Sequence, residues 1–274
     1  MIRPAVSSGN FRPFFTSSLW LFLGSNFKYD LSFLGHRKKT KNLKHKKITF
    51  CTISEWLADH AKESSILKDE KIINMNNHID IENFFPQSKN ISKKALNIST
   101  KKKIIVFGAE NIEAKYKGFH KFVDSLNYLN KNDFMIIIFG KMWDFSEIEK
   151  KGFEYKYFGY VENKELLRNI YNSGDIFAIS SIQDAFPKTF AEAMLCEIPV
   201  VAFENTSISK INLNYKTGYN AKNFDTEDFA KGIIYCCNHP KLGSLAREEI
   251  LKNYNPLEIT KKYINLYKKL LNEK

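Results

Sequence analysis

The sequence has few cysteines, and their positions exclude one kind of site. The four cysteines, Cys51, Cys196, Cys236 and Cys237, are scattered along the 274 residues. The adjacent pair lacks the two-residue spacing that lets two thiolates converge on one metal ion. This pattern argues against a cysteine metal site and favours reduced core cysteines in a cytosolic protein.

Long apolar runs are also absent. No segment approaches the roughly 20 consecutive apolar residues that span a bilayer, so we expect no transmembrane helix. An apolar patch at residues 14–27 follows Arg3 and Arg12. The patch is short and no small-residue cleavage site follows it, so we expect no signal peptide.

Acidic residues are fewer than basic ones. The chain has 42 Lys and Arg against 30 Asp and Glu, a formal charge of +12. Such an excess favours anionic partners such as phosphates, lipid head groups or nucleic acid, although the Lys, Asn and Ile richness fits a biased genome composition equally well. Nucleic-acid binding would rest on charge alone, because the sequence contains no recognised binding module.

The chain has enough apolar residues for a packed core, 43% hydrophobic and 14% aromatic. Residues 1–46 show no clear periodicity and lead into the basic run 36–47, which predicts a surface loop or a solvent-facing helix. A strand and a helix capped by Ser54 follow, then a strand over 71–80. Pro86 and the lysine-rich segment 88–103 mark a boundary.

Beyond residue 103 the pattern is regular. Short apolar strands are predicted at 103–109, 134–140, 155–161, 175–181 and 198–203, and amphipathic helices at 118–130, 145–151, 164–174, 188–196, 226–238 and 256–271. Strands that alternate with helices indicate βαβ units, hence an α/β fold with a parallel sheet covered on both faces. Ligands bind beyond the carboxyl ends of such strands, so the loops after the strands are the candidate site.

Two carboxylates follow the strand at 175–181. Asp184 falls in the loop at the carboxyl end of the strand, and a helix is predicted to begin at Pro187. Glu192 lies off the apolar stripe of this helix and can point into the same crevice as Asp184. The competing interpretation is that Asp184 only favours the helix dipole and Glu192 is a solvated helix residue.

The helix start and two other loops are further candidates. The free N–H groups of Lys188 and Thr189 suit a phosphate. Lys117, before a helix-opening glycine, could place a cation against a diphosphate, unless it is an ordinary exposed lysine. The backbone at Val161 could contact a flat base edge, with Asn163 capping the next helix, unless this loop serves core packing alone.

Four segments, taken in order and at their intervals, resemble a known family. They are "KGFHKFVDSL", "FGYVENKELLRNIYNSGDIFAISS", "DAFPKTFAEAMLCEIPVVAF" and "TGYNAKNFDTEDFAKGI". Together they look like the donor-binding half of a family 4 glycosyltransferase with the GT-B fold, of the type that builds surface polysaccharides. The resemblance implies a nucleotide-sugar-binding glycosyltransferase domain at 100–274, with a Rossmann-like parallel sheet. It is preceded at 1–86 by a remnant of the acceptor-side α/β domain and the crossover.

The resemblance also implies an activity and residue roles. The activity is retaining transfer of a hexosyl group from a nucleotide-sugar to a glycan or lipid-linked acceptor, without a bound metal and with no cofactor. Asp184 matches the first carboxylate of the E-x7-E motif, which holds the donor sugar, and Glu192 matches the second, on the ribose. Lys117 matches a partner of the diphosphate, and Lys188 and Thr189 match its phosphate-facing amides.

This sequence departs from the family pattern at several positions. Asp184 is one methylene shorter than the family's glutamate, Ala109 stands where many relatives have an arginine, and Glu197 replaces a usual glycine. The acceptor domain is expected to be truncated. The alternative function is therefore a catalytically weak remnant that binds a nucleotide-sugar or a partner chain.

The resemblance also bears on location and association. We expect a cytoplasmic protein in peripheral contact with the inner membrane face through its basic N-terminal segment. In the family, the apolar stripe Ile259, Tyr263, Leu266 and Leu270 of the last helix packs against the acceptor domain. We expect part of this stripe to be exposed here, and to favour self-association or a partner chain.

Overall fold

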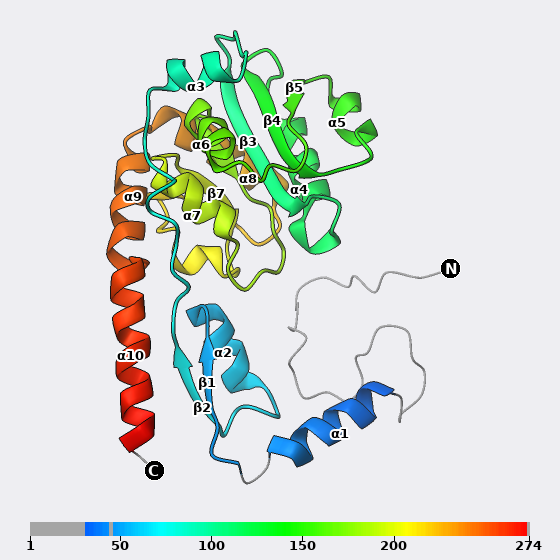
Figure 1. Ribbon diagram of the computed structural model, residues 1–274. Helices are drawn as coiled ribbons and strands as arrows, with labels where there is room; N and C mark the ends of the chain where they lie inside the picture. Colours follow the sequence, from blue (N-terminus) through cyan, green and yellow to red (C-terminus); the bar gives the residue numbers. More distant parts are fainter. Residues whose placement is uncertain (1–30, 44–45, 273–274) are drawn as a thin grey trace. The chain divides into compact units, whose positions relative to one another are not determined.

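The chain forms two compact units, Met1–Met75 and Asn76–Lys274. The computed structural model describes residues 31–43 and 46–272, and each unit is visible in Figure 1. The apolar patch at 14–27 and the arginines before it lie outside the described residues. The first unit ends before residue 86, where the sequence placed the end of the crossover.

Within residues 31–43 and 46–75, the first unit contains two helices and two strands. They are α1 (Leu31–Leu43), β1 (Thr49–Thr52), α2 (Glu55–Glu63) and β2 (Lys71–Asn74), and the two strands pair in parallel. Residues 36–43 of the basic run lie in α1, so a helix carries this part of it. Ser54 caps α2 as predicted, because its side chain accepts a hydrogen bond from the Leu57 N–H at 3.2 Å. The strand predicted over 71–80 ends at Asn74.

The second unit is built on a six-stranded parallel sheet with the order β5-β4-β3-β6-β7-β8. The strands are β3 (Lys103–Asn111), β4 (Phe134–Lys141), β5 (Glu154–Tyr157), β6 (Ile176–Ala178), β7 (Val200–Phe203) and β8 (Gly218–Ala221). The helices are α3 (Lys89–Ala95), α4 (Phe119–Ser125), α5 (Ser146–Lys151), α6 (Lys164–Ser173), α7 (Lys188–Leu195), α8 (Thr226–Asn238), α9 (Leu242–Asn253) and α10 (Pro256–Asn272), with short 3₁₀ turns η1 (Lys115–Lys117), η2 (Leu126–Tyr128) and η3 (Ile208–Lys210). The predicted α/β, Rossmann-like parallel sheet is therefore confirmed.

Successive residues of each strand face opposite layers of helices. Ile105 and Phe107 of β3 lie in one buried cluster with Phe122 of α4 and Phe229 of α8. On the other face Phe177 of β6 packs edge-on against Tyr171 of α6, with ring centroids 5.6 Å apart. Burial on both faces explains why the strands read as continuous apolar runs.

The order in which strands are added to the sheet changes side at β3. It runs outward from β3 to β4 and β5, then returns to place β6 on the other side of β3. Loops after β3 and β6 therefore lead away on opposite sides and leave room for a ligand between them. The two loops are joined: the Ile182 N–H donates to the Tyr116 carbonyl at 2.7 Å, and Ser180 Oγ to the Gly118 carbonyl at 2.8 Å.

Gly118 is required at this junction. Its φ is +67°, in the left-handed region, and a Cβ there would lie 2.0 Å from the Ser180 carbonyl oxygen. Only glycine fits so close an approach of two backbones. The Lys117-Gly118 pair thus has a local structural reason besides any role in binding.

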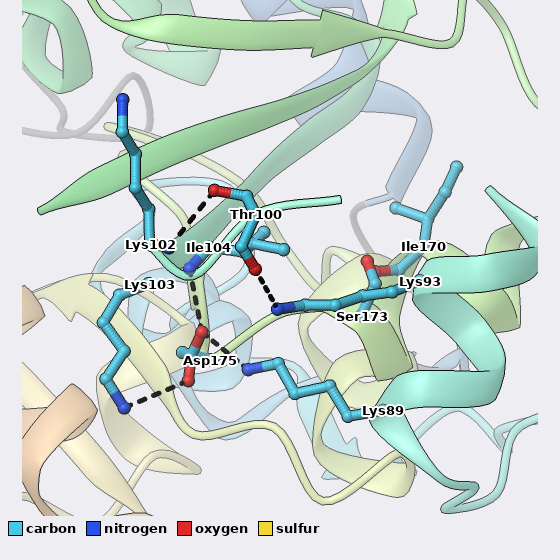
Figure 2. A network of polar contacts seen from close by, with 9 residues as sticks. All are labelled: Lys89, Lys93, Thr100, Lys102, Lys103, Ile104, Ile170, Ser173 and Asp175. Carbon is cyan, nitrogen blue, oxygen red and sulfur yellow. Dashed lines mark hydrogen bonds and ion pairs between the residues drawn. The ribbon is translucent and has the colours of Figure 1, made fainter. Parts of the chain in front are cut away.

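A charged network fixes the amino end of the sheet, and Figure 2 shows it. Asp175, which precedes β6, accepts the Ile104 N–H at 2.8 Å and forms ion pairs with Lys89 at 2.6 Å and Lys103 at 3.4 Å. Burial raises the pKa of Asp175, but the charge and hydrogen bond of Lys89 outweigh it and the net shift is downward. The network holds α3 on the sheet, within the lysine-rich segment that the sequence indicated as a polar boundary.

Two elements, β8 and α9, were not predicted, and one helix boundary differs from the prediction. Pro187 is the residue before α7 rather than its first residue, with φ −73° and ψ 117°. In α10, Ile259 and Leu266 are buried and Tyr263 and Leu270 half-buried, because the opposite face of the helix takes the solvent side, with Leu257, Ile264, Tyr267 and Leu271.

Candidate functional site

A cavity of about 810 Å³ lies within the second unit, beside the segments that follow β5 and β6. Its walls include Tyr160 to Glu162, Lys164, and Lys188 and Glu192 of α7. The chain from His78 to Glu82 lines another side, together with Phe84. Val161, Lys188 and Glu192, which were singled out from the sequence, therefore lie in the wall of one cavity.

The start of α7 presents free backbone donors. Pro187 precedes the helix and makes no side-chain capping hydrogen bond. The first N–H groups of a helix have no intrahelical acceptor, and the helix dipole adds positive potential at this end. Lys188 and Thr189 occupy the first turn, and Lys188 also reaches the cavity. This arrangement suits a phosphate.

Glu192 is held by a buried tyrosine. The hydroxyl of Tyr171 in α6 donates to Glu192 Oε2 at 2.9 Å. Burial raises the pKa of Glu192, while the hydrogen bond from Tyr171 and the charge of Lys188 act in the opposite direction. Glu192 is therefore a fixed acceptor in the cavity wall, and the interpretation of it as a solvated helix residue is wrong.

Lys117 and Asp184 lie where the loops after β3 and β6 meet. Lys117 Nζ is 2.5 Å from Asp184 Oδ2, and each side chain is only 16% exposed. Asp184 Oδ1 also accepts the Phe186 N–H at 3.2 Å. The pair places one cation and one carboxylate at the switch point of the sheet. Lys117 is therefore not an ordinary exposed lysine.

The opposite wall comes from residues within 78–84, near the start of the second unit. Asp80 forms an ion pair with Lys164 of α6 at 2.7 Å and accepts the Asn83 N–H at 3.1 Å. Burial raises the pKa of Asp80, but these hydrogen bonds, with the charge of Lys164, outweigh it and lower the pKa overall. The ion pair with Lys164 thus attaches this wall of the cavity to α6.

Two more residues of α6 continue this attachment. Arg168 donates to the Asn83 carbonyl at 3.1 Å, and its guanidinium lies 4.3 Å from the centre of the Phe85 ring. Asn172 donates to the Phe85 carbonyl at 3.1 Å and accepts the Gln87 N–H at 2.9 Å. Lys164, Arg168 and Asn172 are spaced four residues apart, so they lie along one face of the helix.

Sequence reasoning missed Tyr171, Asp80 and Lys164. Tyr171 falls at an apolar position of a predicted helix and looks like core. Asp80 is 84 residues before its partner, so no local pattern indicates that the two residues meet. Asn163 was predicted to cap α6, and it does, accepting the Leu166 N–H at 2.9 Å.

The cavity and its surroundings combine positive charge with carboxylate acceptors, and Lys188 and Glu192 line the cavity while Lys117, Asp184 and Thr189 are not among its lining residues. The α7 amides, Lys188 and Lys117 offer positive charge, while Glu192 and Asp184 offer carboxylate acceptors. Among residues 31–43 and 46–272, no group of three or more His, Cys, Asp or Glu side chains is placed to hold a metal ion. No helix in the same part of the chain is long and apolar enough to cross a membrane.

The fold and this site define a parallel-sheet α/β protein with a ligand cavity at the carboxyl ends of its strands. A model of one protein family, glycosyl transferases group 1, matches residues 88–253. The chain belongs to this family, and its parallel sheet with flanking helices is a Rossmann-like α/β fold of the GT-B type.

Individual relatives agree with this assignment. A poly(ribitol-phosphate) α-N-acetylglucosaminyltransferase of Staphylococcus aureus is 29% identical over 124 residues, covering 39% of this chain and 25% of the relative. A glycosyltransferase structure from Rickettsia africae has a TM-score of 0.75 at 19% identity, covering 88% of this chain and 68% of that one. HepE from Anabaena, in complex with UDP-glucose, has a TM-score of 0.71 at 16% identity, with coverages of 85% and 67%. The chain thus spans a quarter of the curated relative.

Proposed function

We propose that the protein is a retaining glycosyltransferase that moves a hexosyl group from a uridine-diphosphate sugar to a glycan or lipid-linked acceptor. The family match supports glycosyl transfer. HepE was crystallised with UDP-glucose, which supports the choice of donor. The observation that carries the proposal is the cavity itself, which brings the α7 start and a fixed carboxylate together.

Each residue has a role in this proposal. The ribose hydroxyls donate to Glu192, and the backbone near Val161 contacts the base. The diphosphate lies at the amides of Lys188 and Thr189, with Lys117 within reach as a counter-charge. Asp184 accepts hydrogen bonds from the donor sugar, beside the reacting carbon.

The biological setting is part of the proposal. The curated relative acts on poly(ribitol-phosphate), which supports a role in making a surface polysaccharide. Four free cysteines, three of them buried, support a cytoplasmic location. The exposed basic residues of α1 support peripheral contact with an anionic membrane face.

A thermal-shift titration tests the proposal. Uridine, UDP and a set of UDP-hexoses are added to the purified chain, because a ligand that binds only the folded state raises the unfolding midpoint by mass action. We expect UDP and one UDP-hexose to raise the midpoint more than uridine does. Product release with that donor and candidate acceptors then measures transfer.

Two variants show whether UDP binds in the cavity. Glu192→Ala should weaken UDP binding by about 1–3 kcal/mol, since it removes hydrogen bonds to the ribose. Glu248→Ala, an exposed glutamate of α9, is the control and should leave binding unchanged. Absence of any shift with all UDP compounds would contradict the proposed donor.

A further inference from the structure

Tyr171 is a fully buried tyrosine whose hydroxyl points at the cavity wall. Its ring packs edge-on against Phe84, Phe139 and Phe177, with centroids 5.9, 5.7 and 5.6 Å away. These three edge-on neighbours hold the plane of the Tyr171 ring and so restrict the direction of its hydroxyl. A buried tyrosine hydroxyl needs a hydrogen-bond partner, and Glu192 Oε2 at 2.9 Å supplies it.

The same bond constrains Glu192. The glutamate side chain has three rotatable bonds, yet one carboxylate oxygen is tied to a group that cannot move. A carboxylate has about four acceptor positions, so several remain for a ligand after Tyr171 has used one. The two neighbouring hydroxyls of a ribose match a carboxylate held in this way, because both can donate to it at once.

Charges from several elements surround this carboxylate. Lys188 on α7 and Lys164 on α6 favour its ionised form, and Asp80 on the opposite wall disfavours it. Burial of Cys196, aided by the negative charge of Glu192, raises the pKa of that thiol to about 12. Glu192 is a half-buried carboxylate in the cavity wall, so the hydrogen bond from Tyr171 affects both its geometry and its ionisation.

We infer that Tyr171 is a positioning residue, which orients Glu192 so that its carboxylate binds the vicinal hydroxyls of the nucleotide ribose. The inference rests on the proposed function. Tyr171 acts only through Glu192 and does not touch the ligand. Its loss should therefore reduce discrimination at the ribose and leave the contacts of the base and diphosphate in place.

Calorimetric titration with UDP and with 2′,3′-dideoxy-UDP tests the inference in the whole chain. The wild type should bind UDP at least 10-fold more tightly than the dideoxy analogue. Tyr171→Phe should bind UDP roughly 5- to 10-fold more weakly and the analogue as before. The pH below which UDP affinity falls should move upward in Tyr171→Phe, because the variant lacks a hydrogen bond that favours the ionised carboxylate.

Tyr219→Phe is the matched control. Tyr219 is also a buried tyrosine that donates to a carboxylate, Asp228 Oδ1 at 2.9 Å, but in β8 and α8. It should keep the wild-type preference for UDP. In a Glu192→Ala background, Tyr171→Phe should have no further effect on UDP binding, since the two residues act as one unit.

The possible results distinguish a failure of the inference about Tyr171 from a failure of the proposed function. If the wild type binds neither compound, the proposed donor is wrong. If it binds both equally, Glu192 has no role at the ribose and the inference fails with it. If the wild type prefers UDP and Tyr171→Phe keeps that preference and pH profile, only the inference is overturned.

If Tyr171→Phe does not fold, a second variant tests the inference. Glu192→Asp keeps the charge but shortens the side chain, so the carboxylate cannot reach Tyr171 and the ribose together. We expect it to lose the preference for UDP. A retained preference would overturn the inference.

Discussion

Asp184 is one methylene shorter than the glutamate of the E-x7-E motif that it resembles, and in this chain it meets Lys117. The two side chains, each 16% exposed, form a close ion pair between the loops after β3 and β6. Because the Lys117 and Asp184 side chains are mostly buried, solvent screens their attraction less than it screens a surface ion pair. A diphosphate that uses Lys117 must therefore compete with Asp184.

Asp184→Asn should distinguish the ion pair of Asp184 with Lys117 from the proposed contact of Asp184 with the donor sugar. The neutral amide no longer holds Lys117 as an ion pair, so binding of UDP should be unchanged or tighter. Binding of the UDP-sugar should lose part of its advantage over UDP, because an amide is a weaker acceptor for sugar hydroxyls than a carboxylate. We expect the ratio of the two affinities, measured by calorimetry, to fall about fivefold or more.

Asp184→Glu is the companion variant. It keeps the charge and restores the side-chain length of the family motif, so it should retain the preference for the sugar nucleotide. If Asp184→Asn leaves the ratio at the wild-type value, Asp184 does not contact the donor sugar.

At the scale of elements, the turn that ends α7 carries backbone strain. Glu197 follows the helix with φ +59°, in the left-handed region, where the resemblance leads one to expect glycine. The turn is also tightly packed, because a Cβ on Gly243 of α9 would lie 1.8 Å from the Glu197 carbonyl oxygen. A non-glycine residue in this conformation costs about 1–2 kcal/mol.

Glu197→Gly should stabilise the chain. Relief of the strain exceeds the extra entropy that glycine gives the unfolded state, for a net gain of about 0.5–1 kcal/mol and roughly 2 °C in the unfolding midpoint. Asn205→Gly is the control: Asn205 has φ +60°, but asparagine tolerates this region, so the gain should be smaller. A lower midpoint for Glu197→Gly, measured by differential scanning calorimetry, would show that the Glu197 side chain is needed where it stands.

The elements that the sequence predicted are those with strong local signals. Apolar strands alternating with amphipathic helices gave the parallel sheet, and Ser54 and Asn163 cap helices as expected. α3 is rich in lysine and depends on the ion pair from Lys89 to Asp175, a contact far apart in sequence. β8 is only four residues long and begins with glycine, which weakens a strand signal.

The candidate site likewise contains residues that local signals predict and residues that they do not. Residues in loops after strands, or at a helix start, could be predicted because the topology of a parallel sheet fixes where they lie. Tyr171 and Asp80 could not be predicted, since their significance depends on partners that packing brings together. The sequence therefore predicts the polar groups at the strand ends and the helix start better than the groups that hold them in position.

At the scale of the whole molecule, one unit contains all the groups proposed to bind the donor. The cavity, the α7 start and the pair of Lys117 and Asp184 belong to residues 76–274. The formal charge of +12 favours the approach of an anionic nucleotide. The central claim is that this unit binds a UDP-sugar with its diphosphate at the start of α7 and its ribose at Glu192.

A crystal structure of the chain with UDP tests that claim most directly. We expect the ribose hydroxyls within hydrogen-bond distance of Glu192, the diphosphate at the amides of Lys188 and Thr189, and Tyr171 still bound to Glu192 Oε2. UDP bound away from the cavity, or in the cavity with its diphosphate turned away from α7, would contradict the claim.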